Sequence, residues 1–136
     1  MNKCRGTNAQ GYLSFQLFIQ FWSLTMKLKT MANPTIANIR KQTHEVVIPS
    51  LCPKTGNPMS GSTLTISYVP DEKLLEVFYS LNGYIASFIG SNEVRDLELR
   101  TQVVTRDCNE ILGVSVSVIG KFILNIGQTV ICECES

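Results

Sequence analysis

The sequence predicts an α+β fold, a four-stranded antiparallel sheet with two helices on one face. Segments in which apolar and polar residues alternate, typical of half-buried strands, come in two pairs, and helical patterns occupy the chain between the pairs. A sheet covered on one face by both helices satisfies this order of elements. With 136 residues, 44% of them apolar and 17% charged, the chain has the size and composition of one globular domain.

The first pair of strands is expected at residues 45–49 and 62–69. The first of these is apolar and rich in β-branched residues, which favour strands. In the second, apolar residues at even-numbered positions alternate with hydroxyl-bearing residues, so one face should be buried and the other polar. The polar residues 31–43 are interpreted as an arm that leads into the fold.

The helices are expected after a short extended stretch at residues 74–79. Ser80 can cap the first helix, which should run to Ile89 and stop at Gly90. The second helix should cover residues 92–112, with Asn92 as its N-cap. Its buried stripe recurs at steps of three and four residues and comprises Val94, Leu97, Thr101, Val104, Cys108 and Ile111.

The second pair of strands is expected at residues 114–123 and 129–133, after Gly113 ends the helix. The turn at residues 124–127 makes these two strands antiparallel neighbours. The sheet then has a second face that a chain of this length has little left to cover, and open sheet edges invite pairing with another chain. Oligomerisation through these edges is the simplest expectation.

Residues 1–30 differ from the rest and are expected to lie outside the fold, so that the domain spans 31–136. Residues 12–26 are aromatic and apolar but fall short of the roughly 20 that span a bilayer. No small-residue cleavage site follows them, as it would in a signal peptide. We interpret the segment as upstream sequence, with translation starting at Met26 or Met31, or as a loose tail. The alternative is an interfacial membrane anchor.

Charge and cysteine usage exclude several classes of function. The basic side chains of the first thirty residues leave the rest of the chain slightly acidic, which argues against a broad nucleic-acid surface. Five cysteines without Cys-x-x-Cys spacing, and His44 as the one histidine, argue against a disulfide framework and a zinc site. We expect no metal site, no membrane partner for the fold, and a reducing compartment, the cytoplasm.

One cysteine stands apart from the others by its surroundings. Cys52 lies directly before a proline, within a run of turn-forming residues between the first two predicted strands. A thiol held at a rigid loop is a candidate nucleophile, and nearby Lys54 could favour its thiolate. The alternative is that Cys52 is a small buried hydrophobe. Cys132 and Cys134 share one face of a strand and are interpreted as packed residues.

Several short segments, taken in order, resemble the tunnelling-fold nitrile reductases of the QueF family over roughly residues 44–134. The resemblance implies the tunnelling fold (T-fold), in which subunits close into a multimeric barrel with active sites between them. It also implies reduction of 7-cyano-7-deazaguanine with NADPH to 7-aminomethyl-7-deazaguanine, on the route to queuosine. The matching segments are Cys52-Pro-Lys-Thr-Gly-Asn-Pro58, Thr65-Ile-Ser-Tyr-Val-Pro-Asp71, Leu75-Glu76, Ser80-Leu81, Tyr84 and Ser87-Phe88.

Carried onto this chain, the family chemistry makes Cys52 the catalytic nucleophile. Its thiolate adds to the nitrile carbon and gives a thioimide, which hydride or ammonia can then attack. The resemblance assigns Glu76, Glu98 and Ser80 to substrate binding. A carboxylate that accepts two N–H bonds from a guanine-like edge is sound recognition chemistry. Glu93 rivals Glu98 if the preceding loop is counted differently.

The chain departs from the family at three positions. Met59 stands where the reductases carry the aspartate that donates the proton, and Tyr79 and Asn82 stand at the lysines of the nicotinamide-binding segment. The loss of both lysines weakens the case that the chain binds the phosphates of NADPH. Two alternatives therefore stay open. One is a QueF-like amidinotransferase that adds ammonia to the same nitrile in tRNA, for which an RNA surface is needed. The other is a non-catalytic, ring-forming protein that binds the base.

Overall fold

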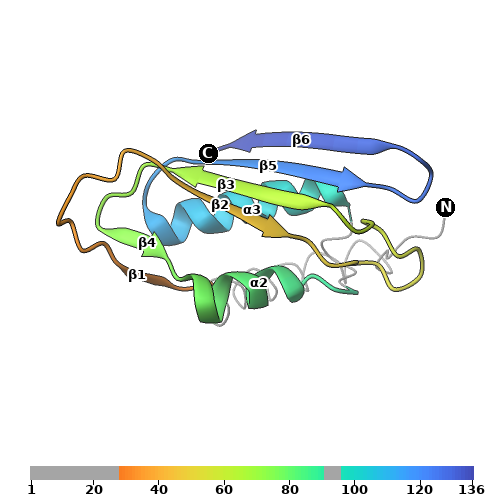
Figure 1. The fold of residues 1–136 in the computed structure, drawn as a ribbon, viewed down its shortest axis with the longest axis horizontal. Coiled ribbons are helices and arrows are strands. Elements are labelled where there is room, and N and C mark those ends of the chain that lie inside the picture. The colour runs from red at the N-terminus through yellow and green to blue at the C-terminus, as the bar shows by residue number, and fades with distance from the viewer. Residues whose placement is uncertain (1–27, 91–95) are drawn as a thin grey trace, which may run out of the picture.

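The computed structural model describes residues 28–90 and 96–136. A four-stranded antiparallel sheet and two helices make up most of this part, and Figure 1 shows both helices on one side of the sheet. The predicted α+β class, with helices on one face of an antiparallel sheet, is confirmed. The strands lie in the order β2 (Gln42–Val47), β3 (Thr63–Tyr68), β5 (Val116–Ile123) and β6 (Thr129–Glu135), and the helices are α2 (Asn82–Ala86) and α3 (Leu97–Leu112). This arrangement is compatible with a tunnelling fold.

β3 lies in the interior of the sheet and pairs along its whole length with β2 on one side and β5 on the other. Ile66 stands opposite His44 of β2 and Val118 of β5. The predicted alternation in β3 is confirmed, because its even-numbered residues are buried and its odd-numbered residues are half-exposed. Successive side chains of a strand point to opposite faces, so only one set meets the helices.

A second, two-stranded sheet was not predicted. β1 (Thr30–Ala32) pairs antiparallel with β4 (Lys73–Leu75), and Leu28, just before β1, is 1% exposed. Residues 28–30 therefore belong to the fold, in contrast to the predicted domain boundary at residue 31. β2 also begins earlier than predicted and takes up the end of the expected arm. The rest of the predicted extension, including residues 12–26, lies outside the described residues.

The first helical segment differs from the prediction at both ends. A π-helical turn, η2 (Val77–Leu81), runs directly into α2, so the predicted extended stretch ends at Leu75. Glu76, with φ −77° and ψ 124°, is the residue that precedes the helical turns. Ser80 therefore lies inside the helical segment and does not cap it. α2 ends at Ala86, three residues before the predicted end at Ile89, and turns lead from there to Gly90, which has φ +70°.

The long helix α3 begins at Leu97 rather than at Asn92. Asp96 has an extended backbone, and its carbonyl accepts the hydrogen bond of the Arg100 N–H, so Asp96 occupies the N-cap position. The predicted cap Asn92 and the predicted stripe residue Val94 lie outside the described residues. The other members of the stripe are buried or packed against the core, and Gly113, with φ +72°, ends the helix as predicted.

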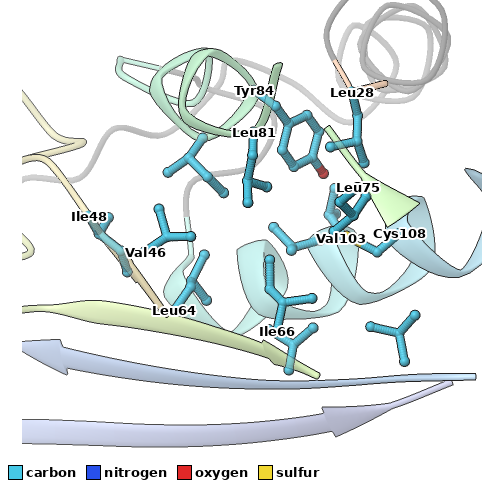
Figure 2. Close-up of a cluster of buried hydrophobic side chains, with 14 of the residues drawn as sticks. Leu28, Val46, Ile48, Leu64, Ile66, Leu75, Leu81, Tyr84, Val103 and Cys108 are labelled. Carbon is cyan, nitrogen blue, oxygen red and sulfur yellow. The ribbon is translucent and has the colours of Figure 1, made fainter. Parts of the chain in front are cut away.

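The core lies between the sheet and the two helices. Figure 2 shows Leu64 and Ile66 of β3 directed toward Leu81 of η2 and Tyr84 of α2, with Val103 of α3 beside them. The backbone of β5 comes close to α3 at Gly120. A Cβ atom at Gly120 would lie 2.5 Å from the ring of Phe122 and 2.9 Å from the hydroxyl of Thr101. Only glycine allows this close approach.

The opposite face of the sheet carries no layer of described residues. Its side chains are half-exposed or exposed, and Val47 on edge strand β2 and Ile131 on edge strand β6 are 73% and 62% exposed. Among the described residues, each edge strand pairs on one side only. Separately, no helix in the described part of the chain has the length and apolar character that crossing a bilayer requires.

Candidate active site

Cys52 lies in the connection between β2 and β3, which we call the cysteine loop (residues 48–62). The N–H groups of Leu51 and Cys52 both donate to the carbonyl of Asn57, at 3.0 Å each, and the Gly56 N–H donates to the Cys52 carbonyl at 2.8 Å. Gly56 has φ +72°, a conformation that glycine adopts without strain. The turn-forming residues thus fold the loop back on itself around Cys52, as the sequence predicts.

The turn between β5 and β6 holds the cysteine loop from outside. The amide of Asn57 donates to the side-chain oxygen of Asn125 at 3.2 Å, and the Asn125 N–H donates to the side-chain oxygen of Asn57 at 2.9 Å. The Asn125 amide also donates to the carbonyl of Thr55 at 3.1 Å. The peptide bond between Asn57 and Pro58 is cis. Asn125, which sequence reasoning missed, is therefore part of the support for Cys52.

The side chain of Cys52 is 9% exposed and its sulfur is disulfide-bonded in this structure. The thiol expected from the sequence is therefore oxidised in this structure. A thiolate nucleophile at this position therefore requires the bond to be reduced first. Lys54 is exposed. Several N–H groups of the loop are already used inside it, so fewer are left to stabilise a thiolate than the turn-rich sequence suggests.

Glu98 lies at the same end of the molecule as the cysteine loop. It is exposed in the first turn of α3, and Figure 1 shows this end of α3 on the side of the loop. A short chain of contacts joins the two. The Gly90 N–H donates to the carbonyl of Leu51 at 2.7 Å, and the Arg100 guanidinium donates to the carbonyl of Phe88 at 3.0 Å. The rival residue, Glu93, lies outside the described residues.

Glu76 lies at the opposite end of the first helical segment. Its N–H donates to the carbonyl of Lys29, whereas the far end of the segment contacts the cysteine loop through Gly90. At about 1.5 Å per residue, the helical turns between these ends span roughly 15 Å. Glu76 and the contact with the cysteine loop therefore lie at opposite ends of this segment.

Ser80, predicted to bind substrate, has another role in this structure. It is 1% exposed, and its hydroxyl accepts from the Lys29 N–H at 3.0 Å and donates to the Glu76 carbonyl at 2.9 Å. The first bond ties η2 to the segment that leads into β1, and the second lies within the helical segment itself. The hydroxyl is thus engaged with backbone in the interior, and we do not assign it to the substrate.

Tyr79 and Asn82 are the residues predicted to hold a nicotinamide cofactor. Asn82 is exposed and, with Glu45, lines a hollow of about 420 Å³ between β2 and α2. No lysine or arginine is among the described residues that line this hollow. Dinucleotide phosphates need cationic or backbone donors, and Glu45 would repel them. The described surroundings of Asn82 therefore do not fit NADPH. The side chain of Tyr79 is not described.

The family's proton donor has no equivalent in the cysteine loop. Met59, at the aspartate position, is 41% exposed, and its thioether carries no proton to donate. The loop contains no carboxylate at any position. Among the described residues, no group of three or more histidine, cysteine or acidic side chains is placed to hold a metal ion.

This geometry defines a class of protein with an antiparallel α+β fold and a cysteine in a loop at one end of the sheet. Within it, the chain is similar to the NADPH-dependent 7-cyano-7-deazaguanine reductases of Bacillus velezensis and Bacillus subtilis. It is 39% identical to each over 74 residues, or 54% of this chain. The match spans less than half of these relatives, 43% and 42% of their lengths. No protein-family model matches the chain. These similarities support a QueF-like relationship.

Proposed function

We propose that the protein is a QueF-type enzyme of 7-deazaguanine metabolism, in which reduced Cys52 attacks the nitrile of 7-cyano-7-deazaguanine. The observation that carries the proposal is the 39% identity to two reductases of this substrate. The position of Cys52 in a turn clamped by Asn57 and Asn125 agrees with it, because a nucleophile needs a fixed direction of attack.

The covalent step follows from the chemistry of the two groups. The thiolate of Cys52 forms a bond to the electrophilic nitrile carbon, one C–N π bond breaks, and the nitrile nitrogen takes up a proton. The product is a thioimide. The amine product lies four electrons and four protons beyond the nitrile. The thioimide must therefore accept one hydride and release the Cys52 thiolate, and the imine left behind must accept a second hydride and a proton. Since Met59 cannot supply the first proton, we propose that it comes from outside the cysteine loop.

Recognition of the heterocycle is proposed to use carboxylates from two subunits. Glu98 lies at the end of the molecule that holds Cys52, whereas Glu76 of the same chain is roughly 15 Å away along the helical segment. A site that contains Cys52 and both glutamates needs Glu76 from a second copy. The uncovered face and the open edges of β2 and β6 provide surfaces for such a homo-oligomer, in a barrel of the tunnelling-fold type.

NADPH is proposed as the reductant because both relatives are named NADPH-dependent. When bound, it would supply the hydrides that the thioimide and the imine require. The described lining of the hollow at Asn82 contains no cationic residue, so we assign no residue of this chain to the phosphates of NADPH and derive no hydride step from the geometry.

The same lack of cations favours a second candidate, the amidinotransferase. In that reaction ammonia displaces the Cys52 thiolate from the thioimide formed on tRNA, and no nicotinamide is needed. The slightly acidic composition of the fold counts against it, because RNA binding depends on clustered basic side chains. A base-binding protein without catalysis is the third candidate, supported by Met59.

The test is adduct formation by protein treated with a reductant and then freed of it. With 7-cyano-7-deazaguanine, we expect a mass increase of one substrate molecule on the wild type and on Cys134→Ala, a control that keeps Cys52. We expect none on Cys52→Ala. NADPH oxidation with amine formation identifies the reductase, and ammonia-dependent turnover on modified tRNA identifies the transferase. Binding of the base without an adduct would overturn the enzymatic proposal.

A further inference from the structure

Arg100 is a buried cation near the candidate site that neither the sequence pattern nor the proposed chemistry uses. Its side chain is 3% exposed, yet no carboxylate among the described residues lies within ion-pair distance of it. One guanidinium nitrogen donates to the carbonyl of Phe88 at 3.0 Å, and Nε has no hydrogen-bond partner in the described part of the chain. Burial lowers its pKa to about 10, so it is still charged at neutral pH.

Such an arginine is hard to explain as a stabilising residue. Removing a guanidinium from water costs several kcal/mol, which a single bond to a neutral carbonyl does not recover. Replacing buried charges by apolar side chains of similar size is often neutral or stabilising. The core beside Arg100 would accept such a side chain, because Val103 and Val104 on the same helix already pack there.

The position of Phe88 gives Arg100 a role. Two residues after Phe88, the Gly90 N–H donates to the carbonyl of Leu51, the residue next to Cys52. A Cβ atom at Gly90 would lie 3.8 Å from the ring of Pro53, in ordinary contact. Residues 88–90 therefore lie between α3 and the cysteine loop, and Arg100 holds them from the α3 side.

We propose that Arg100 is a positioning residue, which fixes residues 88–90 and so sets Cys52 against the start of α3, where Glu98 lies. The inference rests on the proposed function for the identity of the substrate. The mechanical link itself, from Arg100 through Phe88 and Gly90 to the cysteine loop, does not depend on it. Arg100 acts here through backbone groups and does not contact the reacting atoms.

The experiment compares Arg100→Met and Arg100→Lys in reduced protein, with Arg106→Met as the control. Arg106 is on the same helix but pairs with Asp107. Three quantities are measured, namely the urea midpoint, the rate of iodoacetamide modification of the Cys52 peptide, and the rate of adduct formation with 7-cyano-7-deazaguanine. Arg100→Gln replaces Arg100→Met if that variant does not fold.

For Arg100→Met we expect an unchanged or higher urea midpoint. Alkylation of Cys52 should become severalfold faster because the loop opens, and adduct formation roughly tenfold slower because the attack geometry is lost. Arg100→Lys keeps a donor and should recover part of both rates. Arg106→Met should lower the midpoint and change neither rate.

Wild-type alkylation and adduct rates in Arg100→Met would overturn the inference. So would a fall in adduct rate that merely follows a fall in stability, because that indicates a structural role. If the wild type forms no adduct at all, the proposed function fails, and the alkylation rates still decide whether Arg100 positions the cysteine loop.

Discussion

Asn57 and Asn125, 68 residues apart, exchange two hydrogen bonds at the end of the sheet. One belongs to the cysteine loop and the other to the turn between β5 and β6. The Asn57 carbonyl in turn accepts the N–H groups of Leu51 and Cys52. The shape of the loop around Cys52 thus depends on a turn near the C-terminal end of the chain.

Asn125→Ala removes the hydrogen bonds that the Asn125 side chain makes to the Asn57 side chain and to the Thr55 carbonyl. We expect a loss of about 1 kcal/mol in the free energy of unfolding, because the two lost hydrogen bonds are exposed and each contributes at the low end of the usual range. We also expect faster alkylation of Cys52 in reduced protein, because the loop loses its outer support. Urea unfolding and peptide mass spectrometry with iodoacetamide measure the two effects.

Asn109→Ala is the matched control for this prediction. Its amide donates to the carbonyl of Val114 at 2.8 Å, at the end of α3 far from the cysteine loop. It should lose similar stability without a change in Cys52 reactivity. Equal alkylation rates in both variants would mean that the Asn57–Asn125 pair does not shape the loop.

The separation of Glu76 from Cys52 predicts complementation between inactive variants. Cys52→Ala and Glu76→Gln should each lack activity alone, and co-refolded mixtures should regain up to about a quarter of wild-type activity, because some interfaces then pair an intact Cys52 with an intact Glu76. The measurement is turnover of 7-cyano-7-deazaguanine at a fixed total protein concentration. Mixtures as inactive as the single variants would place both residues in one subunit's site, against the geometry of the helical segment.

His44 predicts a loss of stability on acidification. Its Nε2 shares a hydrogen bond of 3.1 Å with the Tyr68 hydroxyl, whose oxygen also accepts the Leu75 N–H at 3.0 Å. Burial lowers the pKa of His44 below 6.5. Below pH 6.5 the unfolded chain therefore binds a proton more readily than the folded chain does. The contribution of His44 is complete above pH 6.5 and is lost as the pH falls toward the lower, folded-state pKa.

His44→Gln keeps a hydrogen-bond partner for Tyr68 but does not titrate. Between pH 7.5 and pH 5.5 the free energy of unfolding of the wild type should fall relative to that of His44→Gln. Acid groups shared by the two proteins, such as Asp107, cancel in this comparison. Parallel curves over the whole range would show that His44 has the same pKa in the folded and unfolded chains.

Prediction from the sequence was accurate where local pattern and burial coincide. The alternation in β3 identified its buried face, because a strand has only two faces. Prediction failed where a distant segment decides the outcome. Ser80 has the side chain of a helix cap, but its hydroxyl accepts a hydrogen bond from the backbone N–H of Lys29, a residue far away in the sequence. Arg100 and Asp107 were missed because charged residues count as exposed in a helical pattern, although both are buried.

The sequence by itself determined the α+β class, the strands of the main sheet, and the turn that surrounds Cys52, because these depend on side-chain periodicity and on the allowed backbone angles of glycine and proline. Only the tertiary structure decided which groups meet at that turn. The Asn57–Asn125 clamp, the Arg100–Phe88 contact and the separation of Glu76 from Cys52 join or divide residues by the packing of helices on the sheet. Contacts of this kind depend on distances through space, for which spacing along the chain carries no signal.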